Sequence, residues 1–260
     1  CRALIVDAEN GKEMATSVKY YPRWMEGKYC DPSKNQYRQH PLDYVEVLEQ
    51  SIKEALSKCD KSVAENVVGI SFDTTGSTPA LTDENGTPLA LLPEFAETPN
   101  AMFILGKDHT AVAAADAINN NAREWEVDYT KYEGGIYSSE WVWAKVLHVL
   151  RQDKSLKSKA YSWIEYCDWL PAILTGETKP EVVKRGRCAS GHKAMWHPDW
   201  NGLPTDNFLT KLGTELSGMR DHLFTETFTS DVPAGNLTPE WAKKLGLSEN
   251  VVVGVSAFDC

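Results

Sequence analysis

The sequence lacks several short patterns that would identify an enzyme mechanism directly. It has no Gly-x-x-x-x-Gly-Lys-Ser/Thr loop, which excludes a P-loop kinase. It has no Gly-x-Ser-x-Gly nucleophile elbow, so it carries no signature of nucleophilic catalysis of that type. None of its six histidines forms a His-Glu-x-x-His motif, and we therefore expect no metal site made by the chain itself.

Paired cysteines and long apolar runs are also missing. The six cysteines show no Cys-x-x-Cys pair and no regular spacing, and a reduced chain accounts for them most simply. No apolar run approaches the roughly 18 residues that a membrane span needs, and the first residues do not resemble a signal peptide. We therefore expect a cytoplasmic protein with no membrane partner.

Positive charge is scarce relative to negative charge. The chain has 27 Lys and Arg residues against 37 Asp and Glu residues, which gives a formal net charge of −10. Nucleic acid and anionic membrane surfaces would not attract such a chain, so we expect neither as a partner. With 260 residues, of which 42% are hydrophobic, the chain can bury a full core as one large domain or two small ones.

Strand and helix patterns alternate along the chain, which predicts an α/β fold. Periodicity and turn signals predict strands at residues 3–7, 13–21, 67–72, 78–82, 87–92 and 251–255. They predict helices at residues 41–58, 110–120, 138–150, 163–177 and 208–223, and a further helix that starts at 238. Thr110, Ser138 and Thr238 are the expected caps of three of these helices.

A cluster of hydroxyl groups follows the apolar run at residues 67–72. Residues 73–78 read Asp-Thr-Thr-Gly-Ser-Thr, which places one carboxylate and four hydroxyls within six residues. Ligand sites in open α/β sheets favour the carboxyl ends of strands, and hydroxyls both donate and accept hydrogen bonds. The cluster could therefore bind a polyhydroxylated molecule, and a Ser/Thr-rich turn is the alternative interpretation.

Longer segments around this cluster resemble the FGGY carbohydrate kinases, and among them the bacterial L-ribulokinases. The resemblance covers Asp-Thr-Thr-Gly-Ser-Thr-Pro at 73–79, Pro-Glu-Phe-Ala-Glu-Thr-Pro-Asn-Ala-Met-Phe at 93–103 and Lys-Asp-His-Thr at 107–110. It continues in Asp-Trp-Leu-x-x-x-Leu-Thr-Gly-Glu at 168–177. The chain departs from the family at Gly106, where a tryptophan is usual.

The resemblance implies a fold and an activity. The fold is an α/β, ribonuclease-H-like (actin-like ATPase) domain with a mixed sheet flanked by helices. Residues 1–260 would be the N-terminal sugar-binding domain, without the family's first strand and without its C-terminal ATP-binding domain. The intact enzyme would transfer the γ-phosphate of ATP, with Mg²⁺, to the 5-hydroxyl of L-ribulose in L-arabinose breakdown. The two ends of the chain, each at a strand, favour an excised piece that is inactive alone.

The resemblance also assigns roles to residues. Asp259 lies in Ala-Phe-Asp-Cys at 257–260, which is similar to the family segment that carries the catalytic base. On position alone, an aspartate after a strand is commonly a cap or turn residue. Lys193 matches a substrate-contacting lysine, although its segment, 184–196, would otherwise be interpreted as a solvated basic loop. Ala80 matches a position that touches the ketose.

Weaker substrate-binding candidates come from clustering and from positions at strand or helix ends. They are Asp73, Thr75, Ser77, Asp108 and Tyr137. Two other functions stay open: a different FGGY kinase of a pentulose or polyol, and a non-catalytic sugar-binding module. The sequence also leaves open whether the protein is a monomer or a homo-oligomer.

Overall fold

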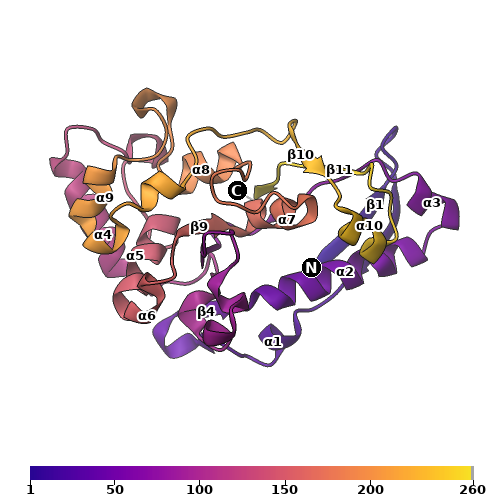
Figure 1. Cartoon of the computed structure of the whole chain (residues 1–260), viewed down its shortest axis with the longest axis horizontal. Coiled ribbons are helices and arrows are strands. Elements are labelled where there is room, and N and C mark those ends of the chain that lie inside the picture. The colour runs from indigo at the N-terminus through magenta and orange to yellow at the C-terminus, as the bar shows by residue number, and fades with distance from the viewer. Residues whose placement is uncertain (259–260) are drawn as a thin grey trace.

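A computed structural model describes residues 1–258 of the chain. The predicted base, Asp259, therefore lies outside the described residues. The described part is elongated, with helices gathered towards both ends and short strands between them (Figure 1). None of its helices is long and apolar enough to cross a bilayer.

Helices of one end pack around a large apolar core. This group contains α4 (Val112–Glu124), α5 (Val142–Gln152), α6 (Lys154–Lys157) and α9 (Asp206–Leu212). The other end contains α2 (Pro41–Ser57), α3 (Lys61–Glu65) and α10 (Pro239–Leu245), with a second core that also includes α7 (Tyr166–Thr175). Two shorter helices are α1 (Pro22–Met25) and α8 (Arg187–Lys193).

The strands form small sheets with both parallel and antiparallel pairs, which confirms the expected mixed α/β architecture. Strand β5 (Gly69–Ile70) is parallel to β11 (Val252–Gly254), which is antiparallel to β10 (Pro233–Asn236). Strand β6 (Asp73–Thr74) is parallel to β12 (Ala257–Phe258). The other antiparallel pairs join β1 (Arg2–Val6) to β2 (Glu13–Val18), β7 (Pro79–Thr82) to β9 (Ser162–Glu165), and β4 (Gln36–Gln39) to both β3 (Cys30–Asp31) and β8 (Phe103–Ile104).

Local signals in the sequence account for the ends of several helices. Helix α2 starts with Pro41, and the ring of His40 accepts a hydrogen bond from the backbone N–H of Leu42 at 3.1 Å. Helix α10 follows the predicted cap Thr238, whose hydroxyl accepts from the N–H of Trp241. Gly176 ends α7 with a φ of 77°, a left-handed conformation that glycine adopts without a steric penalty.

Two expected elements are wrong in type. The strand expected at 87–92 is a short 3-10 helix, Leu89–Leu91, because Leu89 and Ala90 pack into the core. The helix expected from 163 starts only at Tyr166, and Ser162–Glu165 is strand β9. A short apolar run with aromatic and β-branched residues fits a buried strand as well as a helix. Here residues 162–165 form a strand because they pair with β7.

Other boundaries are corrected as well. The strand expected at 67–72 shortens to Gly69–Ile70, and the helix expected at 208–223 ends at Leu212, followed by 3-10 turns. Thr110 is not a helix cap, because its hydroxyl donates to the Asp108 carboxylate. Ser138 accepts from the N–H of Glu140 in a turn that precedes α5.

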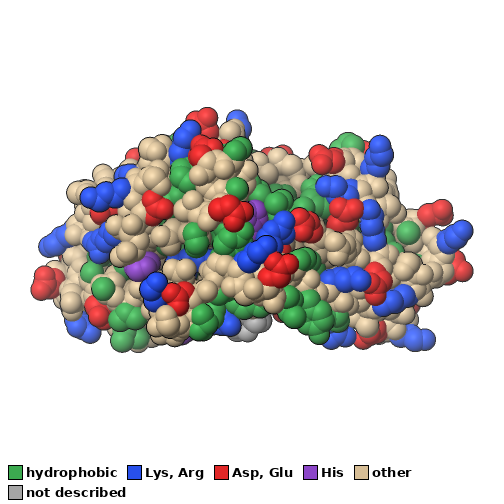
Figure 2. Space-filling model, turned by 90° about the horizontal axis from the view of Figure 1, so that it is seen from below, with side chains coloured by type: hydrophobic (Ala, Val, Ile, Leu, Met, Phe, Trp, Pro, Cys, Tyr) green, Lys and Arg blue, Asp and Glu red, His purple; other side chains and the backbone are tan. Residues whose placement is uncertain are grey.

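Both charge signs are spread over the surface. Figure 2 shows Lys and Arg side chains interspersed with Asp and Glu side chains over one face, with apolar groups between them. No single-sign patch dominates this face.

Candidate active site

The parallel strands bring the hydroxyl-rich loop, residues 73–78, beside the C-terminal end of the described chain. Thr74 of β6 pairs with Phe258 of β12. A Cβ atom added at Gly76 would lie 2.9 Å from the Phe258 ring, so only glycine permits this close approach. The loop and the segment that leads to Asp259 are therefore neighbours in space, although they are far apart in the sequence.

Lys193 reaches the same place from the end of α8. Its Nζ atom lies 5.1 Å from the ring centroid of Trp141 and 5.5 Å from that of Phe258. Both distances suit an attraction between the ammonium and the aromatic faces. Because Phe258 also touches Gly76, the structure gathers Lys193 and the hydroxyl-rich loop around one aromatic side chain.

Buried polar contacts fix the start of α8. Asp168 accepts a hydrogen bond from the backbone N–H of Gly186 at 2.8 Å and lies 3.9 Å from the guanidinium of Arg185. Burial raises the pKa of Asp168 to about 6, and the positive charge of Arg185 opposes that rise. Arg185 is 0% exposed, so the interpretation of this segment as a solvated loop is wrong.

Two further side chains hold the other end of α8. The hydroxyl of Tyr137 donates to the backbone carbonyl of Lys193 at 2.5 Å and accepts from the N–H of Trp143 at 3.0 Å. One oxygen of Glu133 accepts from the N–H of Met195 at 2.7 Å. Tyr137 is 2% exposed, and its hydroxyl already bonds to two backbone groups. It therefore positions Lys193. A direct contact between Tyr137 and the sugar stays a prediction.

The other predicted residues of the hydroxyl-rich region divide into exposed and buried groups. Asp73 and Thr75 are exposed, whereas Ser77 is buried and donates its hydroxyl to Glu165. Ala80 pairs with Ile164 between β7 and β9, with its methyl group in the core. Direct sugar contacts of Thr75, Ser77 and Ala80 stay predictions.

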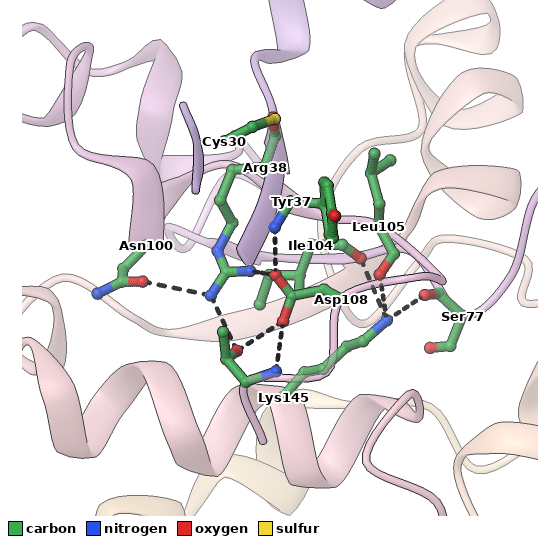
Figure 3. Close-up of polar contacts among 10 residues, drawn as sticks. Cys30, Tyr37, Arg38, Ser77, Asn100, Ile104, Leu105, Asp108 and Lys145 are labelled. Carbon is green, nitrogen blue, oxygen red and sulfur yellow. Dashed lines mark hydrogen bonds and ion pairs between the residues drawn. The ribbon is translucent and has the colours of Figure 1, made fainter. Parts of the chain in front are cut away.

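Asp108 has a structural position, which corrects the expectation of a sugar contact there. It is 0% exposed, and one oxygen accepts from the backbone N–H of Tyr37 at 2.6 Å and from Arg38 (Figure 3). Its other oxygen accepts from the N–H and hydroxyl of Thr110 at 3.1 and 2.5 Å. Four donors therefore occupy this carboxylate, which leaves no oxygen directed at a ligand.

A groove borders the hydroxyl-rich loop. Its volume is about 820 Å³, and its lining includes β1, β5 and residues 73–75, with apolar side chains from α2. Among residues 1–258, no group of three or more His, Cys, Asp or Glu side chains could hold a metal ion.

The sequence interpretation missed Lys145, Glu165, Glu133 and Trp141 as parts of this region. Lys145 carried a detectable signal, because it is the one charged residue in the run Val-Trp-Ala-Lys-Val-Leu at 142–147. Every residue of that run is buried. A lysine enclosed by such a helix needs polar partners, which the sequence could not name.

Curated proteins similar to this chain are ribulokinases. The ribulokinase of Vibrio parahaemolyticus is 54% identical over 260 residues, which is the whole of this chain and 46% of that protein. The ribulokinase of Bacillus licheniformis is 34% identical over 264 residues, covering 99% of this chain and 47% of that protein. The chain thus spans about half the length of the curated relatives it matches. No family model matches the chain.

Solved structures with a similar fold are sugar kinases. A xylulose kinase from Rhodospirillum rubrum has a TM-score of 0.74 at 15% identity and covers 99% of this chain and 46% of its own. A gluconate kinase from Lactobacillus acidophilus has a TM-score of 0.70 at 17% identity, and the match covers 99% of this chain and 45% of the gluconate kinase. The chain therefore has the fold of a sugar kinase domain and is, along its whole length, similar to about half of a ribulokinase.

Proposed function

We propose that this chain is the N-terminal, sugar-binding domain of an L-ribulokinase. The intact enzyme transfers the γ-phosphate of ATP to the 5-hydroxyl of L-ribulose, in the breakdown of L-arabinose. The observation that carries the proposal is the similarity of the whole of this chain to about half of a ribulokinase, with 54% identity in one case. The meeting of the hydroxyl-rich loop, Lys193 and Phe258 supports it, because these residues come from three distant parts of the sequence.

The proposed chemistry needs a proton acceptor and a cation at the sugar. Asp259, next to Phe258 in the sequence, is the proposed base that accepts the proton of the attacking hydroxyl. Lys193 is the proposed donor to the sugar, and its ammonium stabilises negative charge as the phosphoryl group is transferred. Thr75, Ser77, Ala80 and Tyr137 are the proposed further sugar-binding residues.

ATP and its metal ion belong to the complete enzyme in this proposal. ATP brings Mg²⁺ when it binds, and the ion is held mainly by phosphate oxygens and water, as is common for Mg²⁺. The family's C-terminal domain supplies the adenosine pocket. The chain alone is then a sugar-binding half that does not turn over ATP.

We also propose an occupant for the groove beside β1. Among the described strands, β1 pairs only with β2 and β5 pairs only with β11, so each has an unpaired edge. Residues of both strands line the groove. The proposed occupant is the strand that the FGGY fold places before the opening hairpin, hydrogen-bonded to these edges.

A substrate panel with a base variant tests the proposed function. The intact protein is expected to form ADP when L-ribulose is added and to form far less with D-ribulose, D-xylulose, glycerol or gluconate. Asp259→Asn is expected to lower kcat by at least a thousandfold while the circular dichroism spectrum stays unchanged. Normal turnover by Asp259→Asn contradicts the assignment of the base, and preference for another sugar contradicts the assignment of the substrate.

A further inference from the structure

Lys145 is a fully buried lysine that joins two loops of the candidate site. Its Nζ atom donates to the backbone carbonyls of Ser77 at 2.6 Å, Leu105 at 2.8 Å and Ile104 at 3.3 Å (Figure 3). An ammonium has three N–H donors, so these carbonyls use all of them. The side chain thereby ties the hydroxyl-rich loop to the segment after β8.

An apolar residue would fill the same space at a lower desolvation cost. Lys145 is 0% exposed, and its helix neighbours Val142 and Val146 lie in the large core. Burial of an ammonium opposes folding unless hydrogen bonds and opposite charge compensate for it. What lysine supplies at this position, and leucine would not, is the set of bonds to backbone carbonyls.

Glu165 holds the same loop through other groups of its residues. It is 3% exposed at the end of β9, and its two oxygens accept from the Ser77 hydroxyl and from the Thr78 N–H, the latter at 2.6 Å. Burial lowers the pKa of Lys145 and raises the pKa of Glu165, and the charge of each opposes the shift of the other. The two side chains form a charge-balanced pair around Ser77.

We infer that Lys145 and Glu165 are positioning residues of the sugar site, which fix the backbone at Ser77 and Thr78 so that the exposed edge of the loop faces the sugar. Between them they bind the carbonyl and hydroxyl of Ser77 and the N–H of Thr78. Buried side chains therefore hold the loop at Ser77 and Thr78, while Asp73 and Thr75 are exposed. This role rests on the proposed function of the domain.

Three variants of the intact protein separate positioning from stability. Lys145→Met keeps most of the side-chain volume but removes every donor, and Glu165→Gln keeps the shape but removes the charge. Leu147→Ala is the matched control, because Leu147 is 0% exposed on the same helix, belongs to the large core and has no polar side-chain atom. The control lowers stability without removing a bond to Ser77.

The readouts are Michaelis constants for both substrates and hydrogen exchange of the backbone amides at 75–80, where Pro79 has no amide hydrogen. For Lys145→Met we expect at least a tenfold rise in KM for L-ribulose, a KM for ATP within twofold of wild type, and faster exchange at 75–80. Glu165→Gln is also expected to raise the KM for L-ribulose and the exchange rate at 75–80, each by threefold or more. Leu147→Ala is expected to leave both KM values and the exchange of this loop unchanged.

The outcomes also separate this inference from the proposed function. A folded Lys145→Met or Glu165→Gln protein with a sugar KM within twofold of wild type overturns the positioning role. If the wild-type protein phosphorylates no pentulose, the proposed function fails, and exchange at 75–80 still tests whether the pair fixes the loop. In that case, equal exchange rates in wild type and both variants overturn the inference. If Lys145→Met does not fold, the result for Glu165→Gln alone tests the positioning role.

Discussion

At the scale of single residues, Lys193 is the side chain whose charge most directly serves the proposed chemistry. It ends α8, and its ammonium lies 5.1 Å from the ring centroid of Trp141 and 5.5 Å from that of Phe258. We expect Lys193→Met in the intact protein to lower kcat/KM for L-ribulose by roughly a hundredfold, about 2.7 kcal/mol, because one charge-stabilising donor is lost. Steady-state kinetics with varied sugar measures this.

Lys184 offers a matched control in the same basic segment. Its Nζ donates to the backbone carbonyl of Pro233 at 2.6 Å, and the residue is half-buried. Lys184→Met is therefore expected to keep kcat/KM within twofold of wild type. Equal losses in the Lys184 and Lys193 variants would argue against a specific role for Lys193.

Glu133 predicts a pH dependence of stability. Burial raises its pKa from 4.5 to about 9, so the folded protein keeps a proton that the unfolded chain has released at neutral pH. The contribution of Glu133 to the free energy of unfolding is fully present below about pH 4.5 and is lost as the pH rises towards 9. The full shift corresponds to about 6 kcal/mol, and because the side chain is only partly buried we expect about 1–3 kcal/mol.

Glu133→Gln tests this pH dependence. The amide oxygen can still accept from the Met195 N–H, but glutamine does not titrate. Urea unfolding at pH 6 and pH 9 should show a larger loss of stability in wild type than in the variant. Parallel loss in both proteins would mean that other groups cause the pH dependence.

The sequence predicted these residues unevenly. Lys193 and Asp259 were named because they lie in motifs that resemble a family. Lys145 and Glu165 could not be assigned a role, because their partner Ser77 lies 68 and 88 positions away along the chain. Only the fold brings such groups together, and the sequence carries no local signal of the pairing.

At the scale of elements, the close contact between β12 and the hydroxyl-rich loop depends on Gly76. A Cβ atom at this position would lie 2.9 Å from Cγ of Phe258, closer than side chains pack. We expect Gly76→Ala to displace the Phe258 ring, to destabilise the protein by about 1–3 kcal/mol and to raise the sugar KM severalfold. Urea unfolding and steady-state kinetics measure the two effects.

Gly254 in β11 provides the comparison for Gly76. A Cβ there would meet its nearest neighbour at 3.7 Å, an ordinary contact. Gly254→Ala is therefore expected to change stability by less than about 1 kcal/mol. A Gly76→Ala protein as stable as Gly254→Ala would show that the loop does not need this close approach.

The two predicted helix starts that carry a proline were correct, whereas the expected caps Thr110 and Ser138 were not caps and short apolar runs were predicted least well. His40-Pro41 and Thr238-Pro239 carry local capping chemistry, which acts in the same way in any fold. The segment at 162–165 is a strand because it pairs with β7, and this pairing depends on the tertiary structure. Within 184–196, which apart from the resemblance would be interpreted as a basic loop, residues 187–193 form α8, and Asp168 and Tyr137 hold its two ends.

At the scale of the whole molecule, the chain matches about half of its relatives, 46% of the ribulokinase from Vibrio parahaemolyticus. The proposal places the sugar on this half and the adenosine pocket on the other. We therefore expect the isolated 260 residues to form no ADP above background, with or without L-ribulose. Sugar-dependent ATP turnover by the isolated chain would contradict the placement of the adenosine pocket on the other half.

In the proposed function, this domain presents L-ribulose for phosphorylation at its 5-hydroxyl. The most direct measurement incubates the intact protein with ATP, Mg²⁺ and L-ribulose and identifies the product by phosphorus and carbon NMR. The expected products are ADP and a sugar whose fifth carbon couples to phosphorus, in equal amounts. Phosphate on another carbon, or no phosphorylated sugar at all, would contradict it.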